Sequence, residues 1–473
     1  MNYKNILFYL GFILLVVSFF SILNILYAIY FNFIIDLYSY LMTFFTSLLM
    51  SLAFFYYGKN ESKNITLNEQ IIFIFLGFTL MPLFISIPYF FSIYDLTFLD
   101  SYFESVSGIT TTGFSIMKNI NIIDEPLLLW RSSSQWLGGL LFLIAIIGTI
   151  GSKQAKIKPS YLISGGASGK NFYKNFNFNF IKIILIYFIS TLLIIFLFYF
   201  AKVRLFDSVN LAFTAISSGG FVPAKNLYNI LENNLQVFLM SLALLLPIFN
   251  FFIFFDITFK KFEIKNNQED LHLLFLIVFV IFICYFFVIP NESIIKVFFA
   301  VTSSISTSGL SVFEKDFEIS LFFIMLTIIG GSLISTSSGF KYTRFYILLK
   351  ISYQEIYRLV KPMNIIDKNL YNSEARIGDQ DIKVAFLAFI VFIISIFLLS
   401  SILTLDNITF ENSFKLSILT LTNTVNSSLF AMSDLTFFNL SVITKISLII
   451  FMIIGKIEII TVIYLIKRFI FKG

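Results

Sequence analysis

Ile109-Thr110-Thr111-Thr112-Gly113-Phe114 is a short polar segment that ends a hydrophobic run, and related segments occur at three further places in the chain. These are Ile216-Ser217-Ser218-Gly219-Gly220-Phe221, Ile305-Ser306-Thr307-Ser308-Gly309-Leu310 and a degenerate one, Asn423-Thr424-Val425-Asn426-Ser427-Ser428-Leu429. In the first three, a Gly stands four positions after the Ile and precedes a large apolar residue. Such a segment exposes backbone carbonyls, which a bilayer tolerates only where the backbone lines a water-filled path. Four of them around one axis could replace the hydration shell of a cation, so the pattern indicates a pore.

The residues predicted to form the filter of this pore carry backbone carbonyls or hydroxyls that could face an ion. They are Thr110, Thr111, Thr112, Gly113, Ser217, Ser218, Gly219, Gly220, Ser306, Thr307, Ser308, Gly309, Val425, Asn426, Ser427 and Ser428. A terminal Gly allows the left-handed backbone angles that aim successive carbonyls inward. Small-residue runs can also serve only to let helices pack closely. Three runs at matched positions, each after a short helix, favour the pore.

The amino-acid composition is typical of a membrane protein. Of the 473 residues, 58% are hydrophobic and 13% are charged, and the mean hydropathy is +0.90. A soluble globular protein needs more polar residues than this to cover its core. Apolar runs of about twenty residues recur along the chain, which is the length that crosses a bilayer. The sequence therefore predicts an all-α polytopic membrane protein.

The net charge of +6 is explained by basic cytoplasmic loops, and no nucleic-acid partner is expected. The single cysteine, Cys284, excludes a disulfide within the chain, and the single histidine, His272, is expected at the edge of a helix. We find no cluster of His, Asp and Glu that would be buried, so the sequence does not predict an enzyme.

Candidate spanning helices cover residues 5–31, 34–57, 69–94, 126–151, 179–201, 235–260, 268–290, 318–350, 381–403 and 440–469. Shorter semi-polar segments lie between them at 98–110, 205–218, 293–307 and 408–422. Each is roughly 18 Å long as a helix, too short for a hydrocarbon core of about 30 Å, so each is predicted to be a re-entrant pore helix.

The predicted order is two leading helices and then four pseudo-symmetric helix–pore loop–helix repeats. The corresponding units are 1–62, 63–160, 161–262, 263–360 and 361–473. Asp100 and Asp207 stand equally far before Gly113 and Gly220, which indicates that the first two units are copies of one hairpin. Lys296 takes the place of the acid in the third unit.

The distribution of Lys and Arg predicts the topology, because basic loops face the cytoplasm. The loop at 152–178 contains five Lys and no acid, the loop at 341–383 is also basic, and Lys467-Arg468 lies near the C-terminus. With the N-terminus in the cytoplasm, all three regions fall on that side. The four pore segments then enter from outside.

Two further features predict a gate below the filter. The run from Gly330 to Lys341 is rich in Gly and Ser within an apolar stretch, so it should break its helix. Its predicted gating residues are Gly330, Gly331, Ser332, Ser335, Thr336, Ser337, Ser338 and Gly339. Lys456, expected near the middle of the last helix, is an intramembrane cation and is predicted to act as an electrostatic barrier. It stands two positions from Glu458, so the two should face different sides of the helix. A static kink and a snorkelling lysine are the alternative interpretations.

The chain resembles the ion-translocating subunits of the Trk/Ktr/HKT superfamily of potassium transporters, most closely the bacterial TrkH group. The matching segments are Phe103-Glu104-Ser105-Val106-Ser107-Gly108-Ile109-Thr110-Thr111-Thr112-Gly113, Leu129-Trp130-Arg131, Gln135-Trp136-Leu137-Gly138-Gly139, Ser218-Gly219-Gly220-Phe221, Gly330-Gly331, Gly339-Phe340-Lys341 with Arg344, and Gly455-Lys456-Ile457-Glu458. These segments occur in the order found in that group, and the similarity spans the whole chain, including the two extra N-terminal helices typical of TrkH.

The resemblance implies four repeats around one central pathway in the bacterial inner membrane, with K⁺ as the transported ion and no covalently bound cofactor. It implies a homodimer in membrane lipid and a cytoplasmic TrkA-like nucleotide-binding subunit that controls the gating loop. The filter glycines carry over to Gly113, Gly220 and Gly309. The family's fourth filter has a Gly-x-Gly-Leu element, for which Asn426, Ser427 and Ser428 are the matching residues here. Lys456 replaces the family's Arg, and Leu333, Ile334 and Ser338 replace smaller residues of the gating loop.

The sequence thus predicts uptake of monovalent cations, potassium preferred, either by conduction or by symport. A secondary transporter of a small organic solute, with broken helices at its binding site, is the alternative. That alternative calls for inverted repeats, whereas the repeats here run in the same direction.

Overall fold

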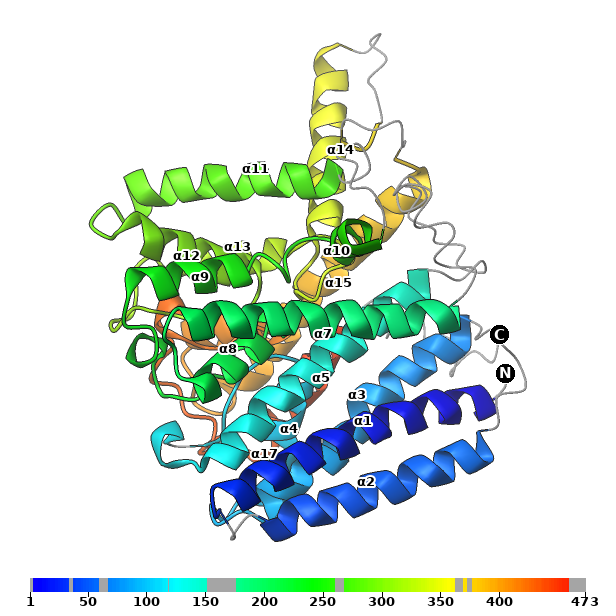
Figure 1. Ribbon diagram of the computed structural model, residues 1–473. Helices are drawn as coiled ribbons and strands as arrows, with labels where there is room; N and C mark the ends of the chain where they lie inside the picture. Colours follow the sequence, from blue (N-terminus) through cyan, green and yellow to red (C-terminus); the bar gives the residue numbers. More distant parts are fainter. Residues whose placement is uncertain are drawn as a thin grey trace.

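The computed structural model describes residues 3–33, 37–58, 67–117, 119–150, 176–259, 268–361, 369–371 and 377–458. Within these ranges the regular structure is helical, as Figure 1 shows. The longer helices are α1 (Tyr3–Tyr30), α2 (Leu37–Tyr57), α3 (Leu67–Phe90), α5 (Glu125–Ile150), α7 (Phe176–Phe200), α11 (Gln268–Ile283), α14 (Tyr342–Val360), α15 (Asp379–Thr404) and α17 (Val442–Ile457). The short helices are α4 (Phe98–Ile109), α8 (Leu205–Ser217), α9 (Asn234–Ala243), α10 (Phe251–Phe259), α12 (Ile294–Ile305), α13 (Ser320–Ile329) and α16 (Phe410–Leu421).

Six helical segments in the described part of the chain are long and apolar enough to cross a membrane. They are Tyr3–Tyr30, Leu37–Tyr57, Glu69–Phe90, Lys182–Phe200, Gln268–Val288 and Asp379–Thr404. The last turn of the fifth is a π-helix, Cys284–Val288. The prediction of an all-α polytopic membrane protein is therefore confirmed.

The two leading helices form a unit at one side of the molecule. Helices α1 and α2 pack against each other and lie side by side at the lower edge of Figure 1. Small polar side chains join them, with Ser21 Oγ donating to Tyr40 O at 2.7 Å and Ser51 Oγ donating to Gly11 O at 2.7 Å. Such short hydroxyl-to-carbonyl contacts let helices approach closely where no hydrophobic effect drives their association.

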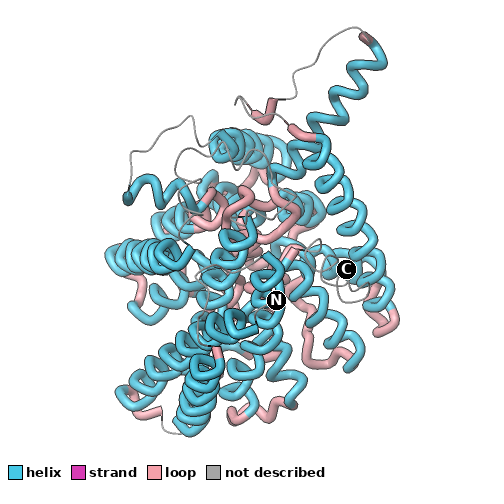
Figure 2. The backbone as a smooth tube through the Cα atoms, turned by 90° about the vertical axis from the view of Figure 1, so that its right-hand side faces the viewer, coloured by secondary structure: helices cyan, strands magenta, loops and turns pink. Residues whose placement is uncertain are grey.

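The four predicted pore helices are all present, as α4, α8, α12 and α16. A hydroxyl caps the start of three of them, because Thr97, Ser293 and Thr409 accept hydrogen bonds from the backbone N–H groups of the first turn. Each helix contains 12 or 13 residues and ends inside the protein. Figure 2 shows loop segments, drawn in pink, gathered in the interior between the surrounding helices.

Two segments that were predicted to be single spanning helices are each divided into two helices, so those two predictions are wrong. The segment predicted at 235–260 is divided into α9 and α10 by a non-helical stretch at 244–250, which contains Pro247. Proline lacks an N–H and clashes with the preceding turn, so a break there has a local cause. The segment predicted at 318–350 is divided into α13 and α14 by residues 330–341, as the Gly and Ser content suggested.

The last helix also differs from its prediction. Helix α17 ends at Ile457, and Glu458 adopts a left-handed φ of 72°. Lys456 is therefore in the final turn of α17, not near the middle of a longer helix. Residues 459–469 of the predicted span, Lys467-Arg468, most of the basic loop at 152–178, and the predicted unit limits at 62, 160 and 262 lie outside the described residues.

Close packing of α5 on the end of α4 positions the first loop. A Cβ at Gly138 would lie 1.9 Å from the carbonyl oxygen of Ile109, the last residue of α4. Gly77, on α3, is a helical glycine with more room, since a Cβ there would first meet Leu141 Cδ2 at 3.2 Å. The backbone oxygen cannot move without shifting the loop, whereas the end of a Leu side chain can rotate.

We therefore expect Gly138→Ala to lower the free energy of unfolding by about 1–3 kcal/mol, the usual cost of overpacking. Gly77→Ala should be neutral or slightly stabilising, because Ala is the better helix former. Thermal unfolding of the detergent-purified variants measures both. Equal melting temperatures for the two variants would contradict the packing argument.

Candidate functional site

Each of the four pore helices ends in the same backbone turn. One residue just after the helix is left-handed in every case: Thr111 (φ 59°), Ser218 (φ 55°), Thr307 (φ 62°) and Asn423 (φ 50°). In three of the turns the next N–H bonds back into the helix, from Thr112 to Ser107 O, from Gly219 to Thr214 O and from Thr424 to Leu419 O, at 2.8–2.9 Å. This is the Schellman arrangement, which satisfies carbonyls that a helix end leaves free. The shared turn puts the four loops in one register.

The register defines loop 1 as residues 110–113, loop 2 as 217–220, loop 3 as 306–309 and loop 4 as 422–425. Two positions after the left-handed residue stand Gly113, Gly220, Gly309 and, in loop 4, Val425. Asn426, Ser427 and Ser428 lie beyond this position, so the predicted register of the fourth segment was wrong. The missed signal is that Leu421 and Val425 repeat the Ile-to-Gly spacing of the other loops.

Asn426 and Ser428 instead hold the segment that follows loop 4. Asn426 Nδ2 donates to Met432 O at 3.1 Å, and Ser428 Oγ donates to Phe313 O at 2.8 Å. The Ser428 hydroxyl also lies 2.7 Å from that of Ser311, downstream of loop 3. The Ser428 contacts connect the segments that follow loops 3 and 4.

The four loops meet where the three glycines and Val425 lie. A Cβ at Gly113 would be 2.8 Å from Gly220 Cα, and one at Gly220 would be 2.4 Å from Val425 Cβ. A Cβ at Gly309 would be 2.7 Å from Val425 O. Gly113 and Gly309 also have left-handed φ values of 86° and 70°. Any side chain at the three glycines would therefore collide with a neighbouring loop.

Hydroxyl pairs brace the loops from within. Thr110 and Thr112 in loop 1, Ser306 and Ser308 in loop 3, and Thr422 and Thr424 in loop 4 form the same hydroxyl–hydroxyl contact, at 2.8, 3.1 and 2.9 Å respectively. Loop 2 has Gly219 at the second position of the pair. Loops 1 and 4 are joined where Asn423 Nδ2 donates to Thr112 Oγ1 at 3.0 Å. All these hydroxyl-bearing residues are buried.

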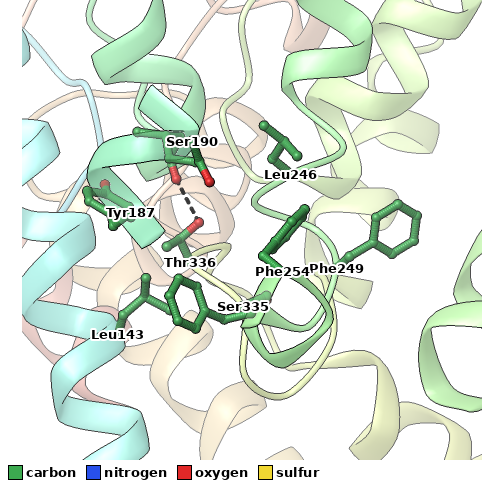
Figure 3. Close-up of a pocket in the computed structure, with 10 residues that line it drawn as sticks. Leu143, Tyr187, Ser190, Leu246, Phe249, Phe254, Ser335 and Thr336 are labelled. Atoms are coloured by element: carbon green, nitrogen blue, oxygen red, sulfur yellow. Dashed lines mark hydrogen bonds between the residues drawn. The ribbon is translucent and has the colours of Figure 1, made fainter. Parts of the chain in front are cut away.

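Residues 330–341 form a compact loop directly against loops 2 and 3. Thr336 Oγ1 donates to Ile216 O at 2.9 Å, just before loop 2, and Ser218 Oγ donates to Thr336 O at 3.1 Å. Ser338 N donates to Thr307 Oγ1 of loop 3 at 2.9 Å. Figure 3 shows Thr336 beside the small pocket that separates this loop from Tyr187, Leu246 and Phe254. The predicted gating residues thus lie in contact with the predicted filter.

The loop is folded on itself as well. Gly331 N donates to Ser337 Oγ at 3.0 Å, and a Cβ at Gly330 would lie 2.5 Å from Ser338 O. Gly330 and Gly339 have left-handed φ values of 65° and 84°. The two glycines therefore allow the chain to leave α13, turn and reach α14 within a small volume.

Two buried lysines hold the loop in place. Lys456, which is 0% exposed, donates to Thr111 Oγ1 at 2.7 Å, to Ser338 Oγ at 3.1 Å and to Thr336 O at 3.3 Å. It thereby links loop 1, α17 and loop 330–341. Lys341 Nζ is surrounded by loop oxygens: Ser337 O at 2.6 Å, Ser335 Oγ at 3.2 Å, Ser335 O at 3.3 Å and Ser332 O at 3.4 Å. The Phe142 ring lies 4.5 Å from Lys456 Nζ and 5.3 Å from Lys341 Nζ.

Several known proteins are similar to this chain in sequence or in fold. Residues 85–270 match the TrkH family model, described as a cation transport protein. An uncharacterized cation transporter of Methanocaldococcus jannaschii is 26% identical over 99% of this chain and 96% of its own length. The Trk system potassium uptake protein TrkG of Escherichia coli is 25% identical over 80% of each chain. The crystal structure of the potassium transporter TrkH from Vibrio parahaemolyticus superposes with a TM-score of 0.82, at 19% identity, over 98% of each chain.

In sequence and in fold, the chain is thus similar to TrkH-type cation transporters. The matching proteins are named as transporters, so the expectation of a non-enzyme is confirmed. The TrkH-like protein is a multi-pass membrane protein, as its apolar helices also indicate.

Some residues that form hydrogen bonds with loop 330–341 are not among the predicted site residues. In the TrkH-like protein the break between α9 and α10 pairs with this loop, since Ser332 N donates to Ile248 O at 2.8 Å and Phe251 N donates to Ile334 O at 2.7 Å. Glu269 accepts from Leu333 N at 2.9 Å and also from Thr343 Oγ1. Its neighbour on α11, Asp270, accepts from Asn250 N at 2.8 Å. The sequence feature that could have indicated these contacts is the presence of two acidic residues, Glu269 and Asp270, in the first turn of an otherwise apolar helix.

Lys456 and Glu458 make separate contacts, as their spacing predicted. Lys456 binds the loops, whereas Glu458 forms an ion pair with Arg344 of α14 at 2.6 Å. This second contact ties the end of α17 to the helix that follows loop 330–341.

We expect Lys456→Gln to loosen loop 330–341, because an amide cannot replace an ammonium that donates to three oxygens. A cysteine at the buried Ser332, in a Cys284→Ser background, reports on the change. Its labelling by a thiol reagent should become at least about tenfold faster, which corresponds to roughly 1.4 kcal/mol of loop stability.

Lys445→Gln provides the matched control. Lys445 is also a largely buried lysine on α17, but it pairs with Asp100 at 2.7 Å and donates to Phe438 O. The Lys445→Gln variant should leave the labelling rate of the cysteine at position 332 unchanged. Equal acceleration by both variants would mean that Lys456 has no specific hold on the loop.

Proposed function

We propose that this TrkH-like protein takes up monovalent cations, with potassium preferred, through a filter formed by loops 1 to 4. The observation that carries the proposal is the common register of the four loops, which brings Gly113, Gly220, Gly309 and Val425 together. A cation entering a dry path loses its hydration and needs an equivalent set of oxygens in place. Backbone carbonyls of the loops supply these oxygens, because the hydroxyls of loops 1, 3 and 4 are engaged with one another.

Potassium is the ion named for the relatives TrkG and TrkH. Three of the four loops here keep a glycine at the point of closest approach, and the fourth presents Val425. An inside-negative membrane potential supports uptake, since 100 mV is worth about 2.3 kcal/mol for each charge that crosses. Whether protons or sodium accompany the ion is decided by flux measurements with and without those gradients.

Loop 330–341 and Lys456 are proposed to form the gate. The loop lies in contact with loops 2 and 3, and Lys456 places a buried positive charge beside loop 1. A fixed cation at this depth repels a permeating one. Opening then requires that the bonds from Lys456 to Thr336 and Ser338 break and that the loop withdraws.

The proposal includes an orientation and partners. The N-terminus faces the cytoplasm of a bacterial cell, so that loops 1 to 4 enter the inner membrane from outside and α14 extends toward the cytoplasm. A homodimer and a TrkA-like nucleotide-binding subunit acting on loop 330–341 complete the assembly. The relatives TrkG and TrkH are named as parts of Trk systems, which supports a partner subunit.

We expect Gly113→Asp to abolish potassium-dependent growth when the gene is expressed in an uptake-deficient host. The new side chain would begin 2.8 Å from Gly220 Cα and would require a left-handed backbone. Gly378→Asp is the matched control, because Gly378 is the N-cap of α15, a position where Asp is favoured. Normal growth of the Gly113→Asp strain, with equal protein in the membrane, would contradict the filter.

A direct test uses purified protein in lipid vesicles. Rubidium and sodium uptake are measured with an imposed potential, with and without sodium and proton gradients. Rubidium uptake that exceeds sodium uptake supports the proposal. Failure to take up either ion would refute it.

A further inference from the structure

A buried ion pair lies immediately behind loop 1. Glu104 of α4 is 0% exposed and Arg131 of α5 is 1% exposed, and Arg131 Nε donates to Glu104 Oε1 at 3.0 Å. Two charges removed from water are costly, and they persist only where geometry and further hydrogen bonds compensate the lost hydration. The pair is therefore held by its surroundings, which are the chain segments that leave loops 1 and 2. These segments, residues 114–116 and Phe221, are called the outer limbs of the two loops.

The first set of contacts is to the chain that leaves loop 1. Glu104 Oε2 accepts from the backbone N–H of Ile116 at 2.8 Å, and Oε1 accepts from Ser115 Oγ at 3.0 Å. Arg131 Nη2 also donates to Ser115 Oγ at 3.0 Å. Ser115 and Ile116 come two and three residues after Gly113. The ion pair thus fixes the outer limb of loop 1 through one hydrogen bond to the backbone of Ile116 and two with the hydroxyl of Ser115.

The second set of contacts is to loop 2. The Arg131 guanidinium lies over the ring of Phe221, with 4.1 Å between Cζ and the ring centroid. One turn further along α5, Gln135 Oε1 accepts from Phe221 N at 3.1 Å. A Cβ at Gly219 would lie 2.2 Å from the same Gln135 oxygen. Helix α5 therefore supports loops 1 and 2 together from behind.

The other repeats lack this charge. Counted back from the glycine, or from Val425 in loop 4, the positions that correspond to Glu104 are Leu211, Ala300 and Leu416, all buried. The outer parts of loops 3 and 4 are joined by the Ser311 and Ser428 hydroxyls instead. A charged brace in one repeat of four is not required by the fold, since three pore helices form without it.

We propose that Glu104 and Arg131 are positioning residues that set the cation selectivity of the filter by fixing the outer limbs of loops 1 and 2. Neither residue touches the ion. Sodium is smaller than potassium and needs the oxygens to move closer together, so a braced loop resists contraction around sodium. This inference rests on the proposed function and adds the residues that determine its specificity.

The test compares two neutralised ion pairs that share helix α4. The first variant is Glu104→Gln with Arg131→Gln. The second is Asp100→Asn with Lys445→Gln. This pair is also buried, with 2.7 Å between Lys445 Nζ and Asp100 Oδ1. Its other hydrogen bonds are to Thr97 and Phe438, which lie outside the filter loops. Changing both partners avoids leaving one buried charge unpaired.

The readout is the ratio of rubidium to sodium uptake in vesicles, which is independent of the amount of active protein. We expect the Glu104/Arg131 variant to lower this ratio about tenfold, equivalent to roughly 1.4 kcal/mol. The Asp100/Lys445 variant should keep the wild-type ratio even if its melting temperature falls. An unchanged ratio in the first variant, or equal losses in both, overturns the proposal.

Ser115→Ala decides the question if the double variant does not fold. It removes the hydroxyl that contacts both charges and leaves the ion pair intact, so expression should be normal and the ratio should fall by about threefold, a fraction of the full effect. A wild-type ratio in this folded variant also overturns the proposal. Wild-type protein that takes up neither ion would instead refute the proposed function, so the two failures are distinguishable.

Discussion

The rule that a buried backbone group needs a hydrogen-bond partner governs this structure more than any other constraint. Lipid offers no partner, so a chain at membrane depth must be helical or enclosed by protein. Among the described residues, the irregular segments in the interior include the four loops, residues 330–341 and the broken stretch at 244–250. Each of them makes hydrogen bonds to another of these segments or to a helix end. The long helices surround these segments and separate them from the lipid (Figure 2).

The irregular segments therefore depend on one another. Loop 330–341 bonds to loops 2 and 3 through Thr336 and Ser338, and to the 244–250 stretch through Ser332 and Ser337. Loop 4 bonds to loop 1 through Asn423. A change in one segment therefore affects its neighbours, because a buried donor or acceptor that loses its partner is costly. Under the proposed function, these direct contacts would couple the gate to the filter.

Much of the fold could be predicted from the sequence, because periodic features leave a clear record. Helix lengths follow from apolar runs, and loops 1 to 3 follow from the repeated spacing between Ile and Gly. Loop 4 was placed incorrectly because its register depends on a backbone angle, the left-handed φ of Asn423, and not on a glycine. The break after α9 was missed because Pro247 alone kinks some helices and ends others. The sequence does not predict the buried contacts of Lys341, since they depend on how residues 332–337 fold around it.

The surroundings of Lys341 have a consequence for the ion that the protein is proposed to carry. Its ammonium is held by four oxygens of loop 330–341, three of them backbone carbonyls, at distances of 2.6–3.4 Å. An ammonium and a potassium ion are both monovalent and of similar size, so the loop has the kind of oxygen shell that such an ion favours. Here that shell is filled by a cation covalently attached to the chain. The folded loop therefore already has its ring of oxygens occupied by a side chain of the same chain.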